Sequence, residues 1–288
     1  MNFGQVLTAM VTPFDQKGNV DLKRTETLID HLIDNETDCL VILGTTGESA
    51  TLTTQEKLEM MRHTVSYVDG RIPVLAGTGT NNTKLSVELT KEATRLGVDG
   101  IMAVAPYYNK PSQRGMVAHF EEIAKSTHLP VMLYNIPGRS VVDMTTETVL
   151  ELAKIPNIVS IKEASGDLEK VAAIIEETED SFSVYSGDDQ LTLPAMAIGA
   201  NGVVSVSSHI IGKDIKQMIE KFKNGKVEEA ALLHRTLLPI MKGMFLAPNP
   251  AALKEALSYK GIDVGGVRLP LISLTEEEKK VLYALLTN

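Results

Sequence analysis

The sequence has few of the residues on which disulfide-linked and metal-binding proteins depend. Cys39 is the single cysteine among 288 residues, so an internal disulfide and a cysteine-based metal site are both excluded. It lies in a short apolar run, where we expect it to be buried as a small hydrophobic residue. The six histidines are scattered, and none has the spacing to an acidic residue that a metal site needs. We therefore predict no metal and no metal-dependent aldolase chemistry.

Positive charge and long apolar runs are also scarce. The 28 Lys and Arg residues are outnumbered by 37 Asp and Glu residues, which leaves a net charge of -9. Because phosphate backbones are bound through patches of Lys and Arg, nucleic acid is not a predicted partner. No apolar run reaches the roughly 18 residues that a membrane span requires. The N-terminus also lacks the pattern of a signal peptide, so we expect a cytoplasmic protein.

Eight short runs rich in Val, Ile and Leu alternate with longer amphipathic stretches. Runs that are apolar on both faces are typical of parallel strands covered by helices. Their spacing of roughly 25–35 residues is that of a strand–helix unit. Eight such units predict an α/β fold, a (β/α)8 TIM barrel. The predicted strands cover residues 5–10, 38–44, 72–77, 100–105, 130–135, 157–162, 182–187 and 202–206.

An open, doubly wound sheet is the alternative fold. The segment Gly77–Thr80 has two glycines but lacks the third glycine and the acidic residue of a dinucleotide-binding loop, so we interpret it as a barrel loop. The strand signal ends near residue 224, and three helices are predicted over 226–243, 251–259 and 275–286. The predicted organisation is a barrel domain over 1–224 and a C-terminal helical region over 225–288.

Other helix boundaries are marked by capping residues. A helix is predicted over Asp21–Asp34, and Thr53 with Glu56 has the spacing of a capping box. The helix predicted over Thr83–Leu96 is followed by Gly97, a residue suited to a C-cap.

The predicted sixth strand ends with a lysine. Alternation along it places Val159 and Ile161 on the face towards the helices and Lys162 in the mouth of the barrel, where these folds carry their active sites. A buried lysine is costly unless it is paired or used chemically. Its amine, once unprotonated, attacks a carbonyl to form a Schiff base. The alternative is a buried ion pair, for instance with Glu163.

Polar residues also end the neighbouring predicted strands. Tyr134 falls at the level of Lys162 and is suited to proton transfer, and Arg139 follows a Pro-Gly turn and is suited to binding a carboxylate. Thr45 and Thr46 offer hydroxyl and backbone N–H groups to an anion. Alone, each has a structural alternative: packing for Tyr134, a solvated side chain for Arg139, and a capped turn for the threonines. Together they predict imine chemistry on a ketone that carries a carboxylate.

Seven motifs resemble the dihydrodipicolinate synthase family, within the N-acetylneuraminate lyase superfamily, and the resemblance covers essentially the whole chain. The motifs lie at residues 8–14, 44–48, 105–108, 134–139, 161–166, 185–189 and 202–206.

The resemblance implies an activity and a role for each site residue. The implied reaction condenses pyruvate with L-aspartate-4-semialdehyde in the diaminopimelate pathway to lysine, without a cofactor, in a homotetramer built as a dimer of dimers, or in its constituent dimer. The resemblance implies that Lys162 forms the imine and that Tyr134 transfers protons, in a relay completed by Thr45 and by Tyr108 of a neighbouring subunit. Thr46 and the Val204 backbone would contact pyruvate. Arg139 would bind the carboxylate of the aldehyde substrate, and the Gly187 carbonyl would line the site.

Two other functions remain as alternatives at this point. N-acetylneuraminate lyase and keto-sugar-acid aldolases share Lys162 and Tyr134, but relatives acting on sugars tend to carry serine in place of Thr45 and to lack Arg139. A sensor or binding protein on the same scaffold would be suggested by the loss of Lys162 or Tyr134, and both are present.

The resemblance also generates a prediction about regulation. Members that lysine inhibits bind it at a subunit interface, and Ser49, Ala50, Asn81 and Tyr107 match that site. Where sensitive relatives have two histidines and a glutamate, this chain has Thr54, Lys57 and Leu85. Because Lys57 repels the ammonium of lysine and Leu85 removes an acidic partner, we expect weak or absent inhibition. A lysine titration of the initial rate tests this, and half-inhibition at sub-millimolar lysine would contradict it.

Overall fold

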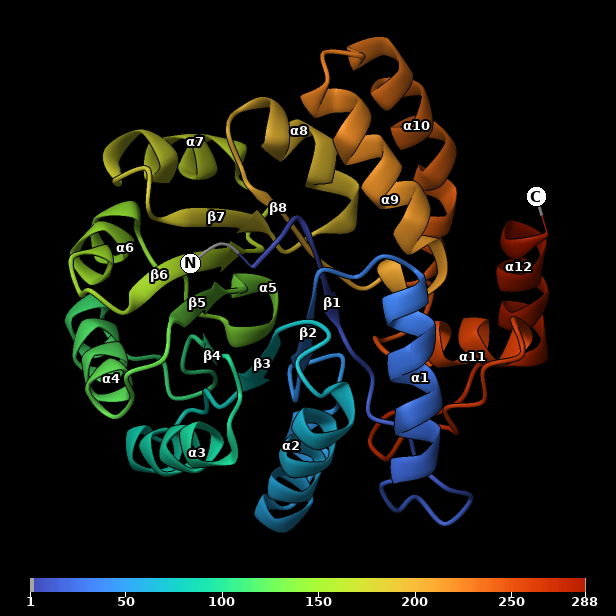
Figure 1. Ribbon diagram of the computed structural model, residues 1–288, viewed down its shortest axis with the longest axis horizontal. Helices are drawn as coiled ribbons and strands as arrows, with labels where there is room; N and C mark the ends of the chain where they lie inside the picture. Colours follow the sequence, from blue (N-terminus) through green and yellow to red (C-terminus); the bar gives the residue numbers. More distant parts are fainter. Residues whose placement is uncertain (1–2, 288) are drawn as a thin grey trace.

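The computed structural model describes residues 3–287, and its centre is a closed barrel of eight parallel strands (Figure 1). Each strand pairs with the next along the chain, and β8 pairs with β1. The predicted (β/α)8 fold is confirmed. The strands are β1 Val6–Ala9, β2 Cys39–Ile42, β3 Val74–Gly77, β4 Gly100–Val104, β5 Val131–Asn135, β6 Ile158–Glu163, β7 Ser183–Ser186 and β8 Gly202–Ser205.

The helices lie outside the strands and cover the barrel (Figure 1). They are α1 Leu22–Asp34, α2 Thr54–Val68, α3 Thr83–Leu96, α4 Gln113–Lys125, α5 Pro137–Ser140, α6 Thr146–Ala153, α7 Leu168–Glu177, α8 Thr192–Ala197, α9 Ser208–Lys223, α10 Val227–Gly243, α11 Ala251–Tyr259 and α12 Glu276–Leu286. Two short 3-10 helices, η1 Ser49–Thr51 and η2 Asp189–Leu191, follow β2 and β7.

The expected capping residues mark the helix ends. The Asp21 side chain caps α1 by accepting from the Arg24 N–H, and Thr53 forms a capping box with Glu56 at α2. Gly97 ends α3 with a φ of 86°, a left-handed conformation that glycine adopts without strain. These local signals confirm the predicted boundaries to within a residue.

Apolar residues on both faces of the strands build one core inside the barrel and two core clusters outside it, the smaller one under α9 and α10. Alternate side chains fill the barrel interior, and the others pack beneath the surrounding helices. Phe3, with 2% of its surface exposed, belongs to the interior cluster. Cys39 is buried in the same cluster, as expected, and burial raises the pKa of its thiol.

One prediction for β6 is wrong. Alternation placed Val159 with Ile161 on the helix-facing side, but Val159 packs against the interior cluster. The pairing of β5 with β6 explains this, because its register shifts between Val131 and Met132, so that Met132 pairs with Ser160 rather than Val159. Above this irregularity the alternation resumes, and Ile161 packs with the outer cluster as predicted.

The C-terminal helices pack on the barrel and its helices. Helix α10 lies against α9, while α11 and α12 contact each other beside α1 (Figure 1). Leu253 and Leu282 belong to the same core cluster as residues of the barrel, so the apolar core continues between the two regions. The domain boundary at residue 224 stays a prediction.

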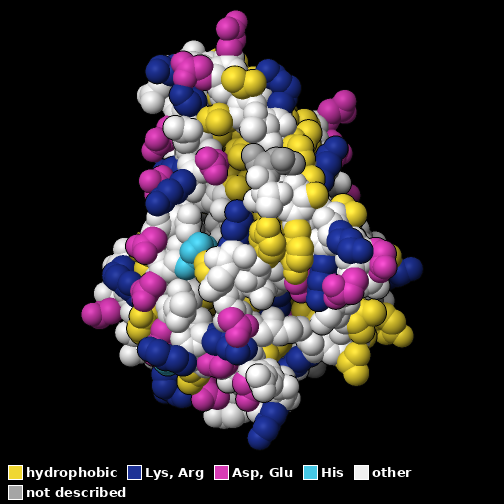
Figure 2. All heavy atoms as spheres, turned by 90° about the vertical axis from the view of Figure 1, so that its right-hand side faces the viewer, with side chains coloured by type: hydrophobic (Ala, Val, Ile, Leu, Met, Phe, Trp, Pro, Cys, Tyr) yellow, Lys and Arg dark blue, Asp and Glu magenta, His cyan; other side chains and the backbone are white. Residues whose placement is uncertain are grey.

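Figure 2 shows the face of the molecule that carries these helices. Acidic and basic side chains are interspersed there, with a band of hydrophobic side chains between them. Exposed apolar residues of the C-terminal region are Val227, Leu232, Phe245, Leu246, Tyr259, Leu269, Ile272 and Val281.

Between residues 3 and 287, no helix has both the length and the apolar character needed to cross a membrane. Within the same residues, His, Cys, Asp and Glu side chains do not gather in groups of three or more suited to a metal ion.

Asp38 ties strand ends together at the amino end of the barrel. One of its carboxylate oxygens accepts hydrogen bonds from the N–H groups of Gln5, at 2.7 Å, and Val6, at 2.9 Å. Lys216 on α9 lies 2.6 Å from the carboxylate. A side-chain ion pair with backbone donors thus stabilises this end of the barrel, at the opposite end from the predicted site.

His209, at the start of α9, is a fully buried histidine in its neutral form. Its Nε2 accepts from the Val11 N–H at 3.2 Å, and its Nδ1–H donates to the Val206 carbonyl at 2.8 Å. Burial lowers the pKa of His209 to about 4, and a charge on His31 disfavours its protonation further. Burial also lowers the pKa of His119 to about 4.

These histidines predict a loss of stability in acid. Unfolded histidine has a pKa of about 6.5, so between that value and about 4 the unfolded chain binds protons that the folded chain does not. Stability is therefore fully present above pH 6.5 and falls as the pH approaches 4. His209→Gln, which does not titrate, should reduce the slope of unfolding free energy against pH by about 1.4 kcal/mol per pH unit. Denaturant melts across this range measure it; exposed His128→Gln is the control, and equal slopes for both variants would contradict it.

Candidate active site

Lys162 and Tyr134 face one another at the carboxyl ends of β6 and β5. The two residues are partners in the strand pairing, as predicted, and Lys162 Nζ lies 4.2 Å from the centre of the Tyr134 ring. Both side chains are buried, with 5% and 3% of their surfaces exposed. A positive charge over an aromatic face is stabilised by the ring's quadrupole, more strongly where water is excluded. Glu163, the ion-pair partner considered from the sequence, instead binds Asn135 and Ser165.

Gly187 brings the end of β7 against the lysine. A Cβ at this position would lie 2.5 Å from Ala164 Cβ, closer than side chains approach, and 3.1 Å from Lys162 Cε, a contact from which the lysine would have to shift. Only glycine therefore allows this approach. The predicted site residue Gly187 is thus a direct neighbour of Lys162.

A cavity of about 620 Å³ opens above this region. Three of the predicted site residues line it: Thr45 after β2, Tyr134 on β5 and Arg139 on α5. Tyr134 connects the cavity to the lysine, because the same residue lines the cavity and contacts Lys162 Nζ. Hydroxyl, phenol and guanidinium groups thus converge on one cavity, as the strand-end pattern predicted.

The loop that carries Thr45 is held tightly against its neighbours. Leu43 and Glu48, on either side of it, have left-handed backbone conformations with φ of 58° and 52°. A Cβ at Gly77 would lie 2.4 Å from the Leu43 carbonyl oxygen, and one at Gly79 would lie 2.3 Å from the Val104 nitrogen. These glycines allow backbones to approach closely. Gly77 ends β3, and the residues from Thr78 to Thr80 lie in the barrel loop between β3 and α3, as predicted.

Thr46 is held by a residue that the sequence did not indicate. Asn249, which precedes α11, donates from its side-chain nitrogen to Thr46 Oγ1 at 3.0 Å and also lines the cavity. Its amide oxygen is buried and has no hydrogen-bond partner among the described residues. Asn249 belongs to no predicted strand or helix, so periodicity could not identify it as a site residue. The one sequence signal was its place beside Pro250 in an irregular segment.

A buried ion pair anchors the same loop to the C-terminal region. Lys254 Nζ on α11 lies 2.7 Å from Glu48 Oε1, and both side chains are almost fully buried. Lys254 also donates to the Gly266 carbonyl at 2.7 Å and lies over the Phe14 ring. Burial lowers the pKa of Lys254 to about 8. The Arg268 N–H donates to the other Glu48 oxygen at 2.9 Å, so both oxygens of this buried carboxylate have a partner.

Two other predicted site residues lie in different surroundings. Val204 is buried in the interior cluster that also contains Tyr134. Tyr108 has a φ of 73°, a left-handed backbone conformation that is uncommon for tyrosine. Its side chain is 87% exposed and so does not pack in the core of its own chain. Within one chain, Tyr108 does not line the cavity; Lys162 and Thr46 do not line it either, but they contact the lining residues Tyr134 and Asn249.

Of the residues considered for regulation, all but Thr54 line the same cavity. Lys57 lies on α2, and burial lowers the pKa of its ammonium group. Leu85 lies on α3. The other lining residues of this set are Ser49, Ala50, Asn81 and Tyr107.

Comparisons with known proteins agree on one family. The profile of the Dihydrodipicolinate synthetase family matches residues 2–288. The chain is 62% identical over 286 residues to 4-hydroxy-tetrahydrodipicolinate synthase 2 of Halalkalibacterium halodurans, covering 99% of this chain and 98% of that one. It is 59% identical over 289 residues to the 4-hydroxy-tetrahydrodipicolinate synthase of Bacillus subtilis, covering all of both chains.

Solved structures extend the similarity to the fold. The crystal structure of a dihydrodipicolinate synthase from Bacillus anthracis superposes with a TM-score of 0.99 at 55% identity, covering 100% of this chain and 98% of that one. An enzyme of the same name from Cyanidioschyzon merolae, solved with lysine bound, superposes with a TM-score of 0.98 at 47% identity and the same coverage.

The close approach at Gly187 predicts the effect of adding one methyl group. In Gly187→Ala the new Cβ collides with Ala164 and displaces Lys162 Cε, so attack by Lys162 Nζ on a carbonyl should slow by about tenfold or more. The rate of borohydride-trapped adduct formation with pyruvate measures it. Gly138→Ala is the matched control, because a Cβ there meets nothing within 4 Å. Equal trapping rates in the two variants would show that this contact does not position the lysine.

Proposed function

The chain belongs to the dihydrodipicolinate synthetase family, and on this premise we propose how its residues divide the work of the reaction. The activity is that of a 4-hydroxy-tetrahydrodipicolinate synthase: a lyase that condenses pyruvate with L-aspartate-4-semialdehyde in diaminopimelate and lysine biosynthesis. The observation that carries the assignment of residues is the buried amine of Lys162 over the Tyr134 ring, beside a cavity lined by Thr45 and Arg139.

Lys162 forms the covalent intermediate. Its unprotonated Nζ attacks the keto carbon of pyruvate, and loss of water leaves a cationic imine. Because the imine nitrogen withdraws electrons, a proton leaves the pyruvate methyl group and a nucleophilic enamine forms. The ring face of Tyr134, 4.2 Å from Lys162 Nζ, supports this role because it favours a positive charge at that nitrogen.

The enamine carbon then attacks the aldehyde carbon of L-aspartate-4-semialdehyde. The amine of that substrate displaces Lys162 from the imine and closes the ring, which regenerates the lysine. Tyr134 donates and accepts the protons that these steps move, and Thr45, which lines the same cavity, links it to the relay. Two substrates that react through one covalent intermediate predict ping-pong kinetics.

The carboxylates of the two substrates need separate donors. Thr46 and the Val204 backbone contact pyruvate, while Gly187 lines the site through its carbonyl. Arg139 on the cavity wall binds the carboxylate of the second substrate, since its planar guanidinium matches a carboxylate in two parallel hydrogen bonds. The bond from Asn249 supports the Thr46 role by fixing its hydroxyl.

Tyr108 completes the relay in a neighbouring copy of the chain. Its high exposure and its left-handed backbone support this proposal, because an exposed aromatic side chain on a strained loop is suited to insertion into a partner. The assembly is a homotetramer arranged as a dimer of dimers, in which the tyrosine pair at 107 and 108 lies at a subunit contact. A cytoplasmic location stays a prediction.

A sugar-acid lyase is the remaining alternative, and the chemistry of the site favours the synthase. Arg139 lines the cavity and Thr45 is a threonine, whereas relatives acting on sugars tend to lack this arginine and to carry serine at the second position. Parallel assays with L-aspartate-4-semialdehyde plus pyruvate and with N-acetylneuraminate separate the two activities.

Trapping with borohydride tests the imine. Reduction in the presence of pyruvate should leave one stable adduct per chain on Lys162, identified by digestion and mass spectrometry, and Lys162→Met should abolish it. Lys57→Met is the matched control, because Lys57 is also a partly buried amine at the cavity. An adduct on Lys57, or none on Lys162 in the unmodified chain, would overturn the assignment.

A further inference from the structure

A second pair of polar residues, Asn135 and Glu163, lies next to Tyr134 and Lys162 on the other face of the same two strands. Asn135 and Glu163 follow Tyr134 and Lys162 in β5 and β6, and they too are partners in the strand pairing. Both are buried, with 0% and 4% of their surfaces exposed. Because successive residues point to opposite faces of a strand, this second pair points away from the barrel interior.

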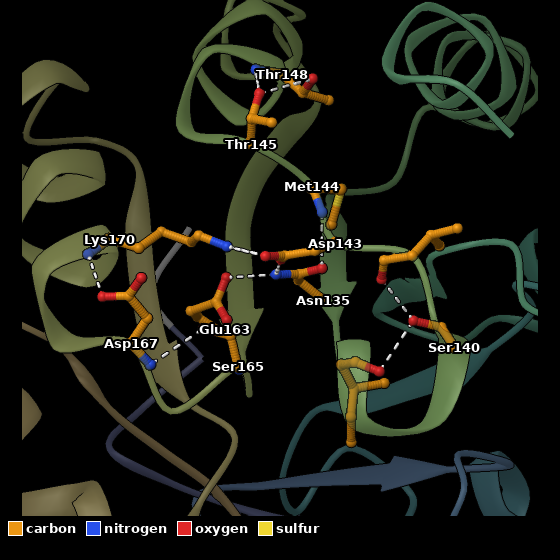
Figure 3. Close-up of polar contacts among 12 residues, drawn as sticks. Asn135, Ser140, Asp143, Met144, Thr145, Thr148, Glu163, Ser165, Asp167 and Lys170 are labelled. Atoms are coloured by element: carbon orange, nitrogen blue, oxygen red, sulfur yellow. Dashed lines mark hydrogen bonds and ion pairs between the residues drawn. The ribbon is translucent and has the colours of Figure 1, made fainter. Parts of the chain in front are cut away.

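The second pair is part of a four-residue polar network that Figure 3 shows. The side-chain nitrogen of Asn135 donates to Glu163 Oε2 at 2.9 Å and to Asp143 Oδ1 at 2.7 Å, and its oxygen accepts from the Met144 N–H at 3.1 Å. Lys170 Nζ on α7 lies 2.6 Å from Asp143. Asn135 therefore uses both its donor hydrogens and its acceptor.

Glu163 is bound as a carboxylate. Its second oxygen, Oε1, accepts from the Ser165 N–H at 2.6 Å, so both oxygens face N–H donors. Burial raises the pKa of Glu163, while the bonds from Ser165 and Asn135 and the charge of Lys170 favour the ionised form. An amide in its place would turn an NH₂ group towards one of these donors and lose that hydrogen bond.

The network joins β5 and β6 next to the residues proposed to react. The register between β5 and β6 shifts between Val131 and Met132, and above this point the strands pair residue by residue up to Asn135 and Glu163. The bond between Asn135 and Glu163 joins the two strands one residue beyond Tyr134 and Lys162. This side-chain bond on the outer face therefore adds to the backbone pairing that places Lys162 Nζ over the Tyr134 ring.

We propose that Asn135 and Glu163, supported by Asp143 and Lys170, are positioning residues that hold Lys162 and Tyr134 in their reactive pairing. The inference rests on the proposed function in that Lys162 forms the imine. The network touches neither substrate, because it lies on the helix-facing side of the strands. It acts on the rate of imine formation and proton transfer, and leaves Thr46 and the Val204 backbone, which contact pyruvate, unaffected.

Glu163→Gln tests the proposal. We expect the rate of borohydride trapping with pyruvate and the kcat of condensation to fall by about 10- to 100-fold, the loss expected for a misplaced reactive group. The KM for pyruvate should change by less than about twofold, since the groups that bind its carboxylate lie on other strands. Asp143→Asn, at a half-exposed position, is a milder second variant that should show a smaller loss with the same pattern, and it decides the matter if Glu163→Gln does not fold.

Asp38→Asn is the matched control. Asp38 also binds two N–H donors and a lysine while joining strand ends, but it does so at the opposite end of the barrel. It should lower the thermal midpoint comparably and leave kcat and the trapping rate unchanged. Equal kinetic losses in the two variants, or a loss in Glu163→Gln confined to KM, would overturn the positioning role. Absence of any Lys162 adduct in the unmodified chain would instead reject the imine itself, so the two failures are distinguishable.

Discussion

The pairing of β5 with β6 is the constraint on which the rest of the site depends. It places a buried amine against an aromatic ring, and this geometry follows from a one-residue match between two strand ends. Barrel closure then brings the other strand ends to the same mouth, so Thr45 and Arg139 share one cavity with Tyr134 although about ninety residues separate the first and the last. A slip of one residue between these strands would turn Lys162 towards the helices and remove the site.

The features predicted from sequence are those with a local signal. The eight strands, the caps at Asp21 and Thr53 and the C-cap at Gly97 each follow from a few neighbouring residues. The residues that end the strands were also predictable, because alternation and the geometry of the barrel determine where they point. Their roles were not, since position distinguishes neither an imine-forming lysine from an ion-paired one nor one keto acid from another; those details came from the resemblance.

What could not be predicted depends on contacts between distant segments. The prediction that Val159 faces the helices was wrong, because a register shift between two strands is not visible in the sequence pattern of either strand. The bond from Asn249 to Thr46 joins residues 203 positions apart, and the bond from Asn135 to Glu163 joins residues 28 positions apart on two paired strands. These hydrogen bonds depend on which residues are neighbours in the folded chain. The sequence shows only a polar side chain in a loop or at a strand end, and it does not show the partner.

The ion pair between Glu48 and Lys254 has a consequence for the order in which the molecule is completed. A ribosome that has released the chain only through β8 has supplied every strand and every group proposed to contact pyruvate, yet Lys254, Asn249 and Arg268 are still missing. A chain that ends before Asn249 therefore contains Thr45 and Thr46 but lacks the three residues that bind the loop carrying them.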